Sequence, residues 1–325
     1  MVPTRMLVTG GAGFIGSTFL NRVVRDRPDV AFLNIDALTY AADLDRLVVT
    51  QEPHYAFERV DIANSAAVDD VLERFEPDCT VHFAAESHVD RSISDPSRFI
   101  RANVVGTHNL LDGHRRLCPT AHFHHIGTDE VYGSAPDGCA FSEGDPYLPS
   151  NPYSASKAAS DHLVRSWHTT FGTPVTLTLC TNNFGPGQHA EKLIPTLIRH
   201  ALRGEPMPIY GTGEHRRNWL SATDHCRAIE AVIEGGKVGA TYHVSSDDTL
   251  SNLQVFSLVC SILADETGTA LDALLALRTH VADRPGHDLR YALDSSKIRA
   301  ELGWRPIQGF EMGLRDTIRW HLESQ

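Results

Sequence analysis

Three glycines near the start of the chain constrain its fold more than any other feature. Gly10, Gly13 and Gly16 follow the short apolar run 6–9 and directly precede the segment 17–25, which has helical spacing. Glycines at such positions let the backbone turn tightly after a strand and approach a pyrophosphate, whose charge the next helix N-terminus stabilises. The spacing alone is weak evidence, but its place between a strand and a helix predicts a dinucleotide-binding unit.

Strand-like and helix-like segments alternate through the first 180 residues. This alternation predicts a parallel sheet covered on both faces, a Rossmann-type doubly wound α/β fold. After about residue 179 glycines and prolines interrupt the rhythm, which favours a smaller, mostly C-terminal substrate-binding lobe. We expect a cofactor domain over 1–180, a lobe over 181–325, and a segment at about 215–250 that could return to the first domain. The expected strands are 32–36, 55–61, 80–85, 122–127 and 175–179, and the expected helices are 68–75, 96–116 and 152–171.

Composition limits the class of protein. The 325 residues are 42% hydrophobic and 22% charged, as in soluble globular proteins, and no apolar run approaches the roughly 20 residues of a membrane span. Residues 1–9 lack the layout of a signal peptide, so we expect a cytoplasmic protein. A net charge of −12 disfavours nucleic acid as a partner. Six scattered cysteines without a C-x-x-C pair indicate free thiols.

Eighteen histidines raise the question of a metal site. His122, His124 and His125 cluster in one apolar stretch, but in a strand the first two share a face and the third points away. Three ligands cannot converge from that arrangement, and no H-E-x-x-H motif occurs. We therefore expect no metal.

An acid after the second strand indicates which dinucleotide the fold would bind. Asp36 ends that strand, at a distance beyond Gly16 that is typical of dinucleotide-binding folds. A carboxylate there can accept hydrogen bonds from both ribose hydroxyls and would repel a 2′-phosphate, which favours NAD over NADP. Asp61 and Ile62, at the end of the third strand, are expected to flank the adenine.

Tyr153 and Lys157 are one helical turn apart in the segment 152–171, so their side chains share a face. A phenol titrates at about pH 10, and a nearby ammonium with a positive nicotinamide ring would favour the phenolate and lower its pKa. Lysine at this spacing also reaches the nicotinamide ribose. Such pairs occur by chance in many helices, but after the fifth strand of this fold the pair predicts a base that starts an oxidation.

Thr128, Asp129 and Glu130 follow the strand 122–127, at the edge where open parallel sheets place active sites. Two adjacent carboxylates near one substrate resist ionising together, so their pKa values should separate. One can then act as an acid and the other as a base. Alone the pair could be two exposed turn acids, but its place upstream of Tyr153 favours catalysis.

With these motifs the chain resembles the extended short-chain dehydrogenases/reductases that act on nucleotide sugars, specifically the dTDP-glucose 4,6-dehydratases. The Asp129–Glu130 pair is the discriminating element, because 4-epimerases of the same fold lack it. The resemblance runs nearly end to end. It is carried by 9–17, 36–41, 84–92, 128–133, 152–157, 182–183, 191–195, 208–210 and 283–288.

The resemblance implies a redox-neutral reaction that turns dTDP-D-glucose into dTDP-4-keto-6-deoxy-D-glucose and water. Tyr153 would take the proton of the 4-hydroxyl while hydride leaves C4 for NAD⁺, and Thr128 would hydrogen-bond O4. Glu130 would then remove the C5 proton, and Asp129 would protonate the departing 6-hydroxyl before hydride returns to C6. Because NAD⁺ is regenerated in each turnover, the cofactor is expected to stay tightly bound.

The resemblance also implies which residues contact the two ligands. Arg217 and Arg284 suit the diphosphate, because a planar guanidinium can bond two phosphate oxygens at once. In this family helices such as 96–116 and 152–171 pair across a two-fold axis, so a homodimer is expected. The cofactor would contact Gly10, Gly13, Phe14, Ile15, Gly16, Asp36, Leu38, Thr39, Asp61, Ile62, Ala84, Ala85, Tyr153, Lys157 and Asn183. The nucleotide sugar would contact Ser87, Thr128, Asn182, Glu191, Lys192, Leu193, Pro208, Tyr210, Arg217, Asn252, Arg284 and His287.

Six positions depart from the family's pattern, but none of them removes a proton-transfer group. They therefore leave the identity of the sugar and of the nucleotide base, thymine or uracil, less determined than the type of reaction. A UDP-sugar epimerase, decarboxylase or other dehydratase on the same scaffold is the alternative enzyme. A catalytically silent NAD-binding regulator is the alternative of another class, and the intact proton-transfer groups argue against it. The departures are Ala102, Gly127, Phe184, Gly187, Asn218 and Ser221.

Overall fold

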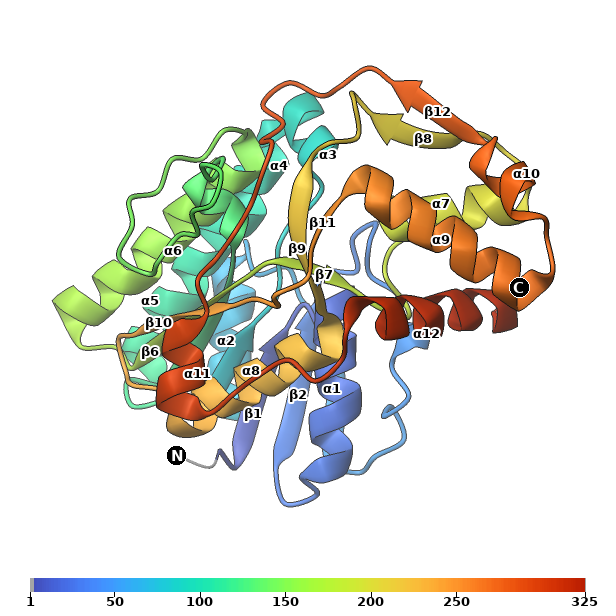
Figure 1. The fold of residues 1–325 in the computed structure, drawn as a ribbon. Coiled ribbons are helices and arrows are strands. Elements are labelled where there is room, and N and C mark those ends of the chain that lie inside the picture. Colours follow the sequence, from blue (N-terminus) through green and yellow to red (C-terminus); the bar gives the residue numbers. More distant parts are fainter. Residues whose placement is uncertain (1–2, 325) are drawn as a thin grey trace.

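A seven-stranded parallel sheet forms the centre of the larger part of the molecule (Figure 1). The computed structural model describes residues 3–324. The strand order, β10-β6-β5-β4-β1-β2-β3, confirms the doubly wound fold that the alternation predicted. The strands are β1 (Arg5–Thr9), β2 (Ala31–Asp36), β3 (Tyr55–Arg59), β4 (Cys79–His82), β5 (His122–Thr128), β6 (Val175–Cys180) and β10 (Thr241–Val244).

Helices cover both faces of this sheet. On one face α1 and α8 pack together, and Phe19, Val23 and Ile229 join strand residues in one hydrophobic cluster. On the other face α2, α5 and α6 surround a cluster that includes Leu72 and Leu111. These helices are α1 (Phe14–Asp26), α2 (Ser65–Phe75), α5 (Thr107–Leu117), α6 (Pro152–Phe171) and α8 (Ala222–Gly235).

A smaller lobe, at the upper right of Figure 1, is built mainly from residues beyond β6. Its core includes Phe184, Phe256 and Leu314. Two small sheets support it, with strand orders β11-β9-β7 and β12-β8. The strands are β7 (Asn182–Phe184), β8 (Met207–Tyr210), β9 (Arg216–Ser221), β11 (Thr249–Ser251) and β12 (Arg278–Val281), and the helices are α7 (Leu193–Leu202), α9 (Asn252–Thr267), α10 (Leu271–Leu275) and α12 (Phe310–Glu323).

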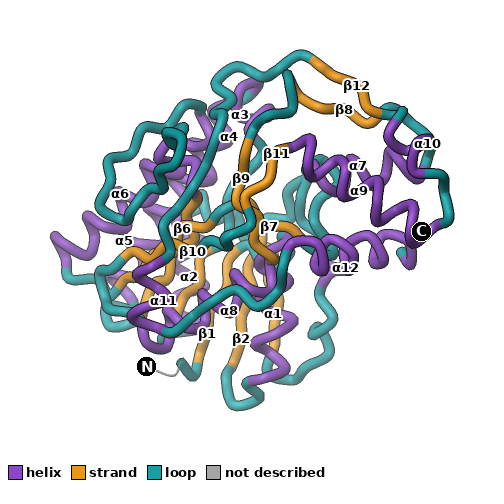
Figure 2. Tube along the Cα trace, in the orientation of Figure 1, coloured by secondary structure: helices purple, strands orange, loops and turns teal. Residues whose placement is uncertain are grey.

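The chain leaves the large sheet after β6 and comes back to it after β9. Helix α8 packs against α1, and β10 then pairs in parallel with β6, placing Thr241 opposite Leu177 and Val244 opposite Cys180. Figure 2 shows β10 next to β6 at the side of the sheet far from β2. A later helix, α11 (Ser296–Leu302), packs against β10. The last strand of the sheet therefore comes from beyond the first segments of the lobe.

The segment 96–116, expected as one long helix, is interrupted in the structure. Between α4 (Pro96–Phe99) and α5 a wider π-helical stretch spans Ile100–Gly106. The buried Asn103 in this stretch donates from Nδ2 to the Glu86 carbonyl at 3.0 Å and to Ser156 Oγ at 2.8 Å. These contacts tie the chain after β4 to α6, so tertiary packing, which the helical pattern does not encode, decides the wider turn.

The ends of α6 are set by local sequence. Asn151 and Ser154 form a capping box at its start, Pro152 occupies the first turn, and Gly172 ends it in the left-handed region at φ 72°. The helix therefore begins immediately before Tyr153, on the side of the sheet where β5 ends.

The cysteines and the lengths of the helices bear on the class of protein that the composition predicted. All six cysteines are free thiols, and Cys139 is the exposed one. Within residues 3–324, no helix is both long enough and apolar enough to cross a membrane.

The histidines of β5 point as the strand pattern predicts. His122 and His124 both face Thr176, with ring nitrogens 2.7 and 2.8 Å from its Oγ1. His125 faces the opposite side, where its Nε2 lies 3.1 Å from Asp161 Oδ1. The three imidazoles are thus engaged with protein partners on two faces and do not converge.

Buried neutral histidines make the stability of the fold sensitive to acid. Burial lowers the pKa of His114 to about 4 and that of His225 to about 3. In the unfolded chain these histidines bind protons below their ordinary pKa of 6.5, whereas in the folded protein they stay neutral. The free energy of unfolding is therefore highest above pH 6.5 and decreases as the pH falls towards 4. Each such histidine contributes a slope of about 1.4 kcal/mol per pH unit in that window.

Thermal unfolding at pH 7.5 and pH 5.5 tests this expectation in a range where most carboxylates remain ionised. The melting temperature should drop at the lower pH. The drop should shrink in His114→Gln, which removes one of the buried imidazoles. A melting temperature that is level across this range would contradict the expected proton uptake.

Candidate active site

The loop after β1 brings the backbone close to the neighbouring strand ends. Gly10 has φ 74°, and a Cβ there would come within 2.5 Å of the Ala84 backbone nitrogen. A Cβ on Gly16 would come within 2.4 Å of the Gly10 carbonyl. Helix α1 begins directly after Gly13, which provides no side-chain cap, so its first N–H groups are free to face an anion.

Asp36 closes the far side of this loop at the end of β2. Its carboxylate accepts hydrogen bonds from the backbone of Ala12 at 3.0 Å and of Leu38 at 2.8 Å. Burial raises the pKa of Asp36, and the two backbone N–H groups oppose that rise. Leu38 takes a positive φ of 55°, a conformation rare for a non-glycine residue, to reach this contact. The carboxylate is thus held in a fixed orientation beside the glycines.

A cavity of about 470 Å³ runs from the glycine loop past the ends of β4, β5 and β6. Its form fits a dinucleotide: the glycines let the loop fold tightly against its own backbone and that of Ala84, so the start of α1 opens into the cavity, and Asp36 stands where a ribose would follow. Leu38 is the predicted cofactor residue that is absent from its wall, since its backbone holds Asp36 instead. The predicted cofactor residues in the wall are Gly10, Gly13, Phe14, Ile15, Gly16, Asp36, Thr39, Asp61, Ile62, Ala84, Ala85, Tyr153, Lys157 and Asn183.

Tyr153 and Lys157 reach the inner end of this cavity from α6. Both side chains are buried, and Lys157 Nζ donates to the Ile126 carbonyl at 2.6 Å. The expected lowering of the tyrosine pKa is not found in the chain itself: burial raises the pKa of Tyr153, and the charge of Glu130 raises it further. Local spacing could not reveal this, because both causes are tertiary. A positive ligand at this end of the cavity would act in the opposite direction.

A short 3₁₀ turn, Asp129–Tyr132, follows β5 and brings two carboxyl groups to the cavity wall. Thr128 caps the turn by accepting from the Glu130 N–H at 3.4 Å, and its hydroxyl donates to Asp129 Oδ1 at 3.2 Å. Burial, and then the charge of Glu130, raise the pKa of Asp129 to about 8. Asp129 can therefore hold a proton at neutral pH beside its neighbour. A raised pKa for one member of the pair agrees with the behaviour predicted for two adjacent carboxylates.

Arg217 of the lobe approaches this carboxyl pair. It is 5% exposed, its guanidinium donates to the carbonyls of Asp288 and Leu289, and it lies over the Tyr291 ring at 4.1 Å. The Tyr291 hydroxyl in turn lies 3.4 Å from Glu130 Oε2. Arg217 is therefore a buried cation beside the site rather than a partner in a surface ion pair.

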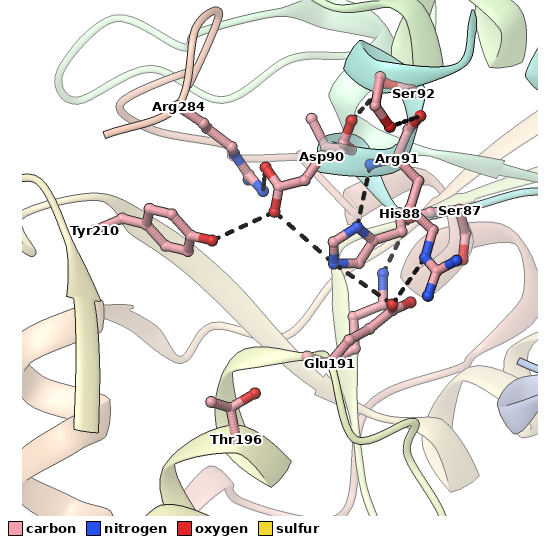
Figure 3. Close-up of polar contacts among 12 residues, drawn as sticks. Ser87, His88, Asp90, Arg91, Ser92, Glu191, Thr196, Tyr210 and Arg284 are labelled. Carbon is pink, nitrogen blue, oxygen red and sulfur yellow. Dashed lines mark hydrogen bonds and ion pairs between the residues drawn. The ribbon is translucent and has the colours of Figure 1, made fainter. Parts of the chain in front are cut away.

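A second polar cluster lies where α3 (Val89–Ser94) meets the lobe (Figure 3). Asp90 is at its centre: the Tyr210 hydroxyl donates to Oδ2 at 3.4 Å, and Arg284 Nη1 is 3.8 Å from Oδ1. The buried Nε of Arg284 has no partner in the protein. Two residues predicted to bind the nucleotide sugar thus converge on one carboxylate, and one of them keeps a free donor.

Glu191 joins the same region to the cavity. Figure 3 shows its carboxylate below His88 and Arg91, with Arg91 Nε at 3.3 Å and His88 Nε2 at 3.8 Å. The next residue, Lys192, is also turned inward and donates to the Ser87 carbonyl at 3.0 Å. Contacts between the α3 segment and the start of α7 therefore connect the sheet with the lobe across the cavity mouth.

The predicted substrate residues fall into two groups. The wall of the cavity holds Ser87, Thr128, Asn182, Glu191 and Lys192. His287 lies further out, stacked on His215 at 3.6 Å, and Asp283 contacts both rings. Leu193 begins α7 and packs on the lobe core, and Pro208 lies in β8. The predicted residues outside the cavity wall are Leu193, Pro208, Tyr210, Arg217, Asn252, Arg284 and His287.

Several residues of the site were not singled out from the sequence. His88, Asp90 and Arg91 fall in the motif 84–92 just after a strand, and that position was the available signal. Tyr291 carried no such signal, since its contact with Glu130 joins residues far apart in the chain.

Three of the six departures from the family pattern make structural contacts outside the cavity. Phe184 is buried between Trp219 and Phe310. Asn218 donates to the Ser246 carbonyl at 3.0 Å, and Ser221 caps α8. None of these three side chains lines the cavity, and Ala102 does.

Comparison with known proteins places these observations in a family. The chain matches the family model described as GDP-mannose 4,6 dehydratase over residues 7–317. The dTDP-glucose 4,6-dehydratase of Neisseria meningitidis serogroup B is 47% identical over 334 residues, covering 99% of this chain and 94% of that protein. The dTDP-glucose 4,6-dehydratase of Haemophilus influenzae is 47% identical over 333 residues, covering 98% and 97%. The crystal structure of DesIV, a dTDP-glucose 4,6-dehydratase from Streptomyces venezuelae with NAD and dTDP bound, has a TM-score of 0.90 and 43% identity, covering 98% of this chain and 97% of that one.

Proposed function

The chain belongs to the dTDP-glucose 4,6-dehydratase family, and we propose that it converts dTDP-D-glucose into dTDP-4-keto-6-deoxy-D-glucose and water. It is an NAD-dependent hydro-lyase of nucleotide sugars. The observation that supports the residue assignment best is that Asp129, with a pKa raised to about 8, stands beside Glu130 in the cavity of Tyr153 and Lys157. This combination provides an acid and a base in addition to the groups that an oxidation requires.

The cofactor would lie along the cavity, with its phosphates at Gly10 and Gly13 and a ribose at Asp36. The chemistry supplied by bound NAD is the uptake of a hydride from C4 of the sugar and its return to C6. Lys157 would hold the nicotinamide ribose at the inner end. Because uptake and return balance, the chain needs no second redox partner.

The first proton transfer belongs to Tyr153. Its phenolate takes the proton of the 4-hydroxyl as C4 is oxidised, and the Thr128 hydroxyl donates to O4 and stabilises the charge that develops there. The positive charges of Lys157 and of the nicotinamide ring favour the phenolate. They offset the burial and the Glu130 charge that raise the pKa of Tyr153 in the chain alone.

The elimination belongs to the carboxyl pair. The new 4-keto group acidifies the proton on C5, and Glu130 removes it as general base. Asp129 gives its own proton to the 6-hydroxyl, which leaves as water when the C5–C6 double bond forms. A proton then returns to C5 as hydride arrives at C6. The sugar therefore loses one water overall. Tyr153 has gained the 4-hydroxyl proton and Asp129 has given one up, so the net transfer of one proton from Tyr153 to Asp129 restores both groups before the next turnover.

The lobe would hold the nucleotide. The partnerless Nε of Arg284 and the buried guanidinium of Arg217 supply donors for a diphosphate. Ser87, Asn182 and Lys192 line the cavity where the sugar would lie. The acidity of the whole chain is compatible with this, because two arginines in one cleft suffice to bind a diphosphate locally.

A panel of nucleotide sugars tests the proposal directly. Purified enzyme, with its bound cofactor, is incubated separately with dTDP-glucose, UDP-glucose and GDP-mannose, and the products are identified by mass spectrometry. We expect loss of one water from dTDP-glucose and the alkaline absorbance of a 4-keto sugar. Isomerisation of a UDP-sugar without loss of mass would instead indicate a 4-epimerase. Inactivity on every member of the panel would overturn the assignment.

We further propose a homodimer formed through the segment 96–116 and α6. Two large apolar side chains of the segment 96–116 are exposed: Ile100 by 50% and Val105 by 42%. Light scattering should give twice the 35.8 kDa of one chain, and Ile100→Glu should shift the mass towards that of a monomer. A monomeric wild-type protein at micromolar concentration would contradict this proposal.

A cytoplasmic location is proposed as well. The six free thiols support a reducing compartment, because disulfides are rare there. Cell fractionation with an antibody against the protein checks the location, and recovery with the membrane or the secreted fraction would contradict it.

A further inference from the structure

Asp161 lies one helical turn beyond Lys157 on α6 and takes no part in the mechanism above. We propose that Asp161 is a positioning residue that keeps the Lys157 ammonium charged and directed at the cavity. The inference rests on the proposed function, since it concerns the lysine that assists Tyr153. It adds a buried counter-charge, held beneath β5, to the groups that contact substrate or cofactor.

The spacing of α6 places the three side chains in one row. Tyr153, Lys157 and Asp161 follow at intervals of four residues, so they share a face of the helix. Asp161 is fully buried. Its Oδ1 lies 3.1 Å from His125 Nε2, and its Oδ2 accepts from the Tyr147 hydroxyl at 3.0 Å. The carboxylate is therefore held in place from β5 and from the loop before α6.

The contacting partners of Asp161 are neutral. Burial lowers the pKa of His125 to about 4, so its imidazole is uncharged at neutral pH, and the Tyr147 phenol is neutral as well because burial raises its pKa. The pKa of Asp161 itself is lowered: burial opposes this, but His125, Lys157 and Arg165 together favour the carboxylate. Asp161 thus carries a negative charge in a fully buried position.

Lys157 needs such a charge. The residue is 5% exposed, and its ammonium donates to the carbonyl of Ile126. Burial lowers the pKa of a lysine, by several pH units where nothing compensates, and here the charge of Asp161 raises the pKa of Lys157 again. An ammonium without this counter-charge would lose its proton more easily and could no longer stabilise the Tyr153 phenolate.

The other titratable groups around Lys157 do not supply the compensation. From β4, His82 is neutral because burial lowers its pKa, and from β6 the Cys180 thiol keeps its proton because burial raises its pKa to about 12. From the turn after β5, Asp129 has a pKa raised to about 8. The charge of Glu130 raises the pKa values of Tyr153 and Asp129. Among these groups, Asp161 is the one whose charge raises the pKa of Lys157 most.

Gly127 provides the space for this carboxylate. A Cβ at that position would lie 3.2 and 3.3 Å from the two oxygens of Asp161 and 3.0 Å from Leu179 Cγ. A side chain at this position would crowd the carboxylate from the strand side. The departure at Gly127 therefore accompanies a close approach of Asp161 to β5.

The charge of Lys157 can be measured directly, because the chain contains four lysines. Holoenzyme labelled with ¹³Cε-lysine gives one NMR signal per lysine, and Lys157→Arg assigns the signal in question. In the wild-type protein we expect the ammonium to persist above pH 8. In Asp161→Asn the titration should move to lower pH by about one to two units. The alkaline limb of the kcat profile should move with it, which a merely structural defect would not cause.

Tyr147→Phe is the matched control, because it removes the other hydrogen bond to Asp161 and leaves the charge in place. It should leave the Lys157 titration unchanged. The inference is overturned if Asp161→Asn titrates like the wild type, or if Tyr147→Phe shifts the titration as much. Should Asp161→Asn fail to fold, the wild-type spectrum still decides, since a Lys157 that is neutral at pH 7 would overturn it.

The outcome separates this inference from the proposed function. The lysine titration is read from holoenzyme without substrate, so it does not depend on which sugar the enzyme uses. Inactivity across the substrate panel would overturn the proposed function alone. Normal turnover by the wild type, together with a Lys157 titration that is unchanged in Asp161→Asn, would overturn the role of Asp161 alone.

Discussion

The Glu130→Gln variant is expected to oxidise C4 of the sugar and then stop. The amide keeps the size of the side chain but cannot remove the C5 proton, whereas Tyr153 and Lys157 are unchanged. Overall turnover should fall by about 10²- to 10⁴-fold, the usual contribution of one general base. In a single-turnover experiment the absorbance of reduced nicotinamide should rise and persist, because the C6 acceptor for its hydride never forms.

A matched substitution separates the role of Glu130 from a general effect of removing a carboxylate. Glu143 accepts from the His243 N–H at 3.0 Å and lies outside the cavity wall, so Glu143→Gln should turn over like the wild type. Full dehydratase turnover by Glu130→Gln, or decay of the reduced nicotinamide at the wild-type rate, would remove Glu130 from its role.

The Tyr153→Phe variant is expected to fail one step earlier. Without the phenol no base takes the proton of the 4-hydroxyl, so neither reduced nicotinamide nor 4-keto sugar should accumulate. The rate of C4 oxidation should fall by about 10²- to 10⁴-fold, and binding of dTDP-glucose should persist, since the proposed diphosphate donors Arg217 and Arg284 are intact. The two variants thus differ in the spectrum of the bound cofactor and not only in rate.

Stopped-flow absorbance on mixing with dTDP-glucose distinguishes the two variants, and calorimetry checks that ligand still binds. Tyr55→Phe is the control for loss of a phenol, because the Tyr55 hydroxyl accepts from Asn34 Nδ2 outside the cavity wall. Rapid formation of reduced nicotinamide by Tyr153→Phe would show that another group removes the 4-hydroxyl proton.

Much of the fold could be predicted because its signals are local. The glycines after β1, the strand patterns and the caps of α6 each lie within a few residues of the structure that they determine. The break in the segment 96–116 could not be predicted in this way. It depends on Asn103, whose amide joins Glu86 and Ser156 from two other parts of the chain.

In the candidate site, too, the features with local signals could be predicted and those that depend on distant contacts could not. Asp129 and Glu130 are neighbours, and Tyr153 and Lys157 are one turn apart, so their spacing, together with their place after the fifth strand, predicts that each pair acts together. Tyr291 reaches Glu130 from the far end of the chain, and no local pattern indicates that contact. The burial that raises the pKa of Tyr153 in the chain without cofactor could not be predicted from spacing, because burial is a property of the assembled fold.

The return of the chain to the sheet also determines the order in which the protein can fold during synthesis. When the ribosome has released β6, that strand is still a sheet edge with a row of unpaired N–H and C=O groups. The free side of β6 is paired by β10, which emerges about 60 residues later, after the first segments of the lobe, and then forms the outer strand of the sheet. The side of β6 is thus open to pairing with other chains over that interval, and its native partner arrives only after the first segments of the lobe have been made.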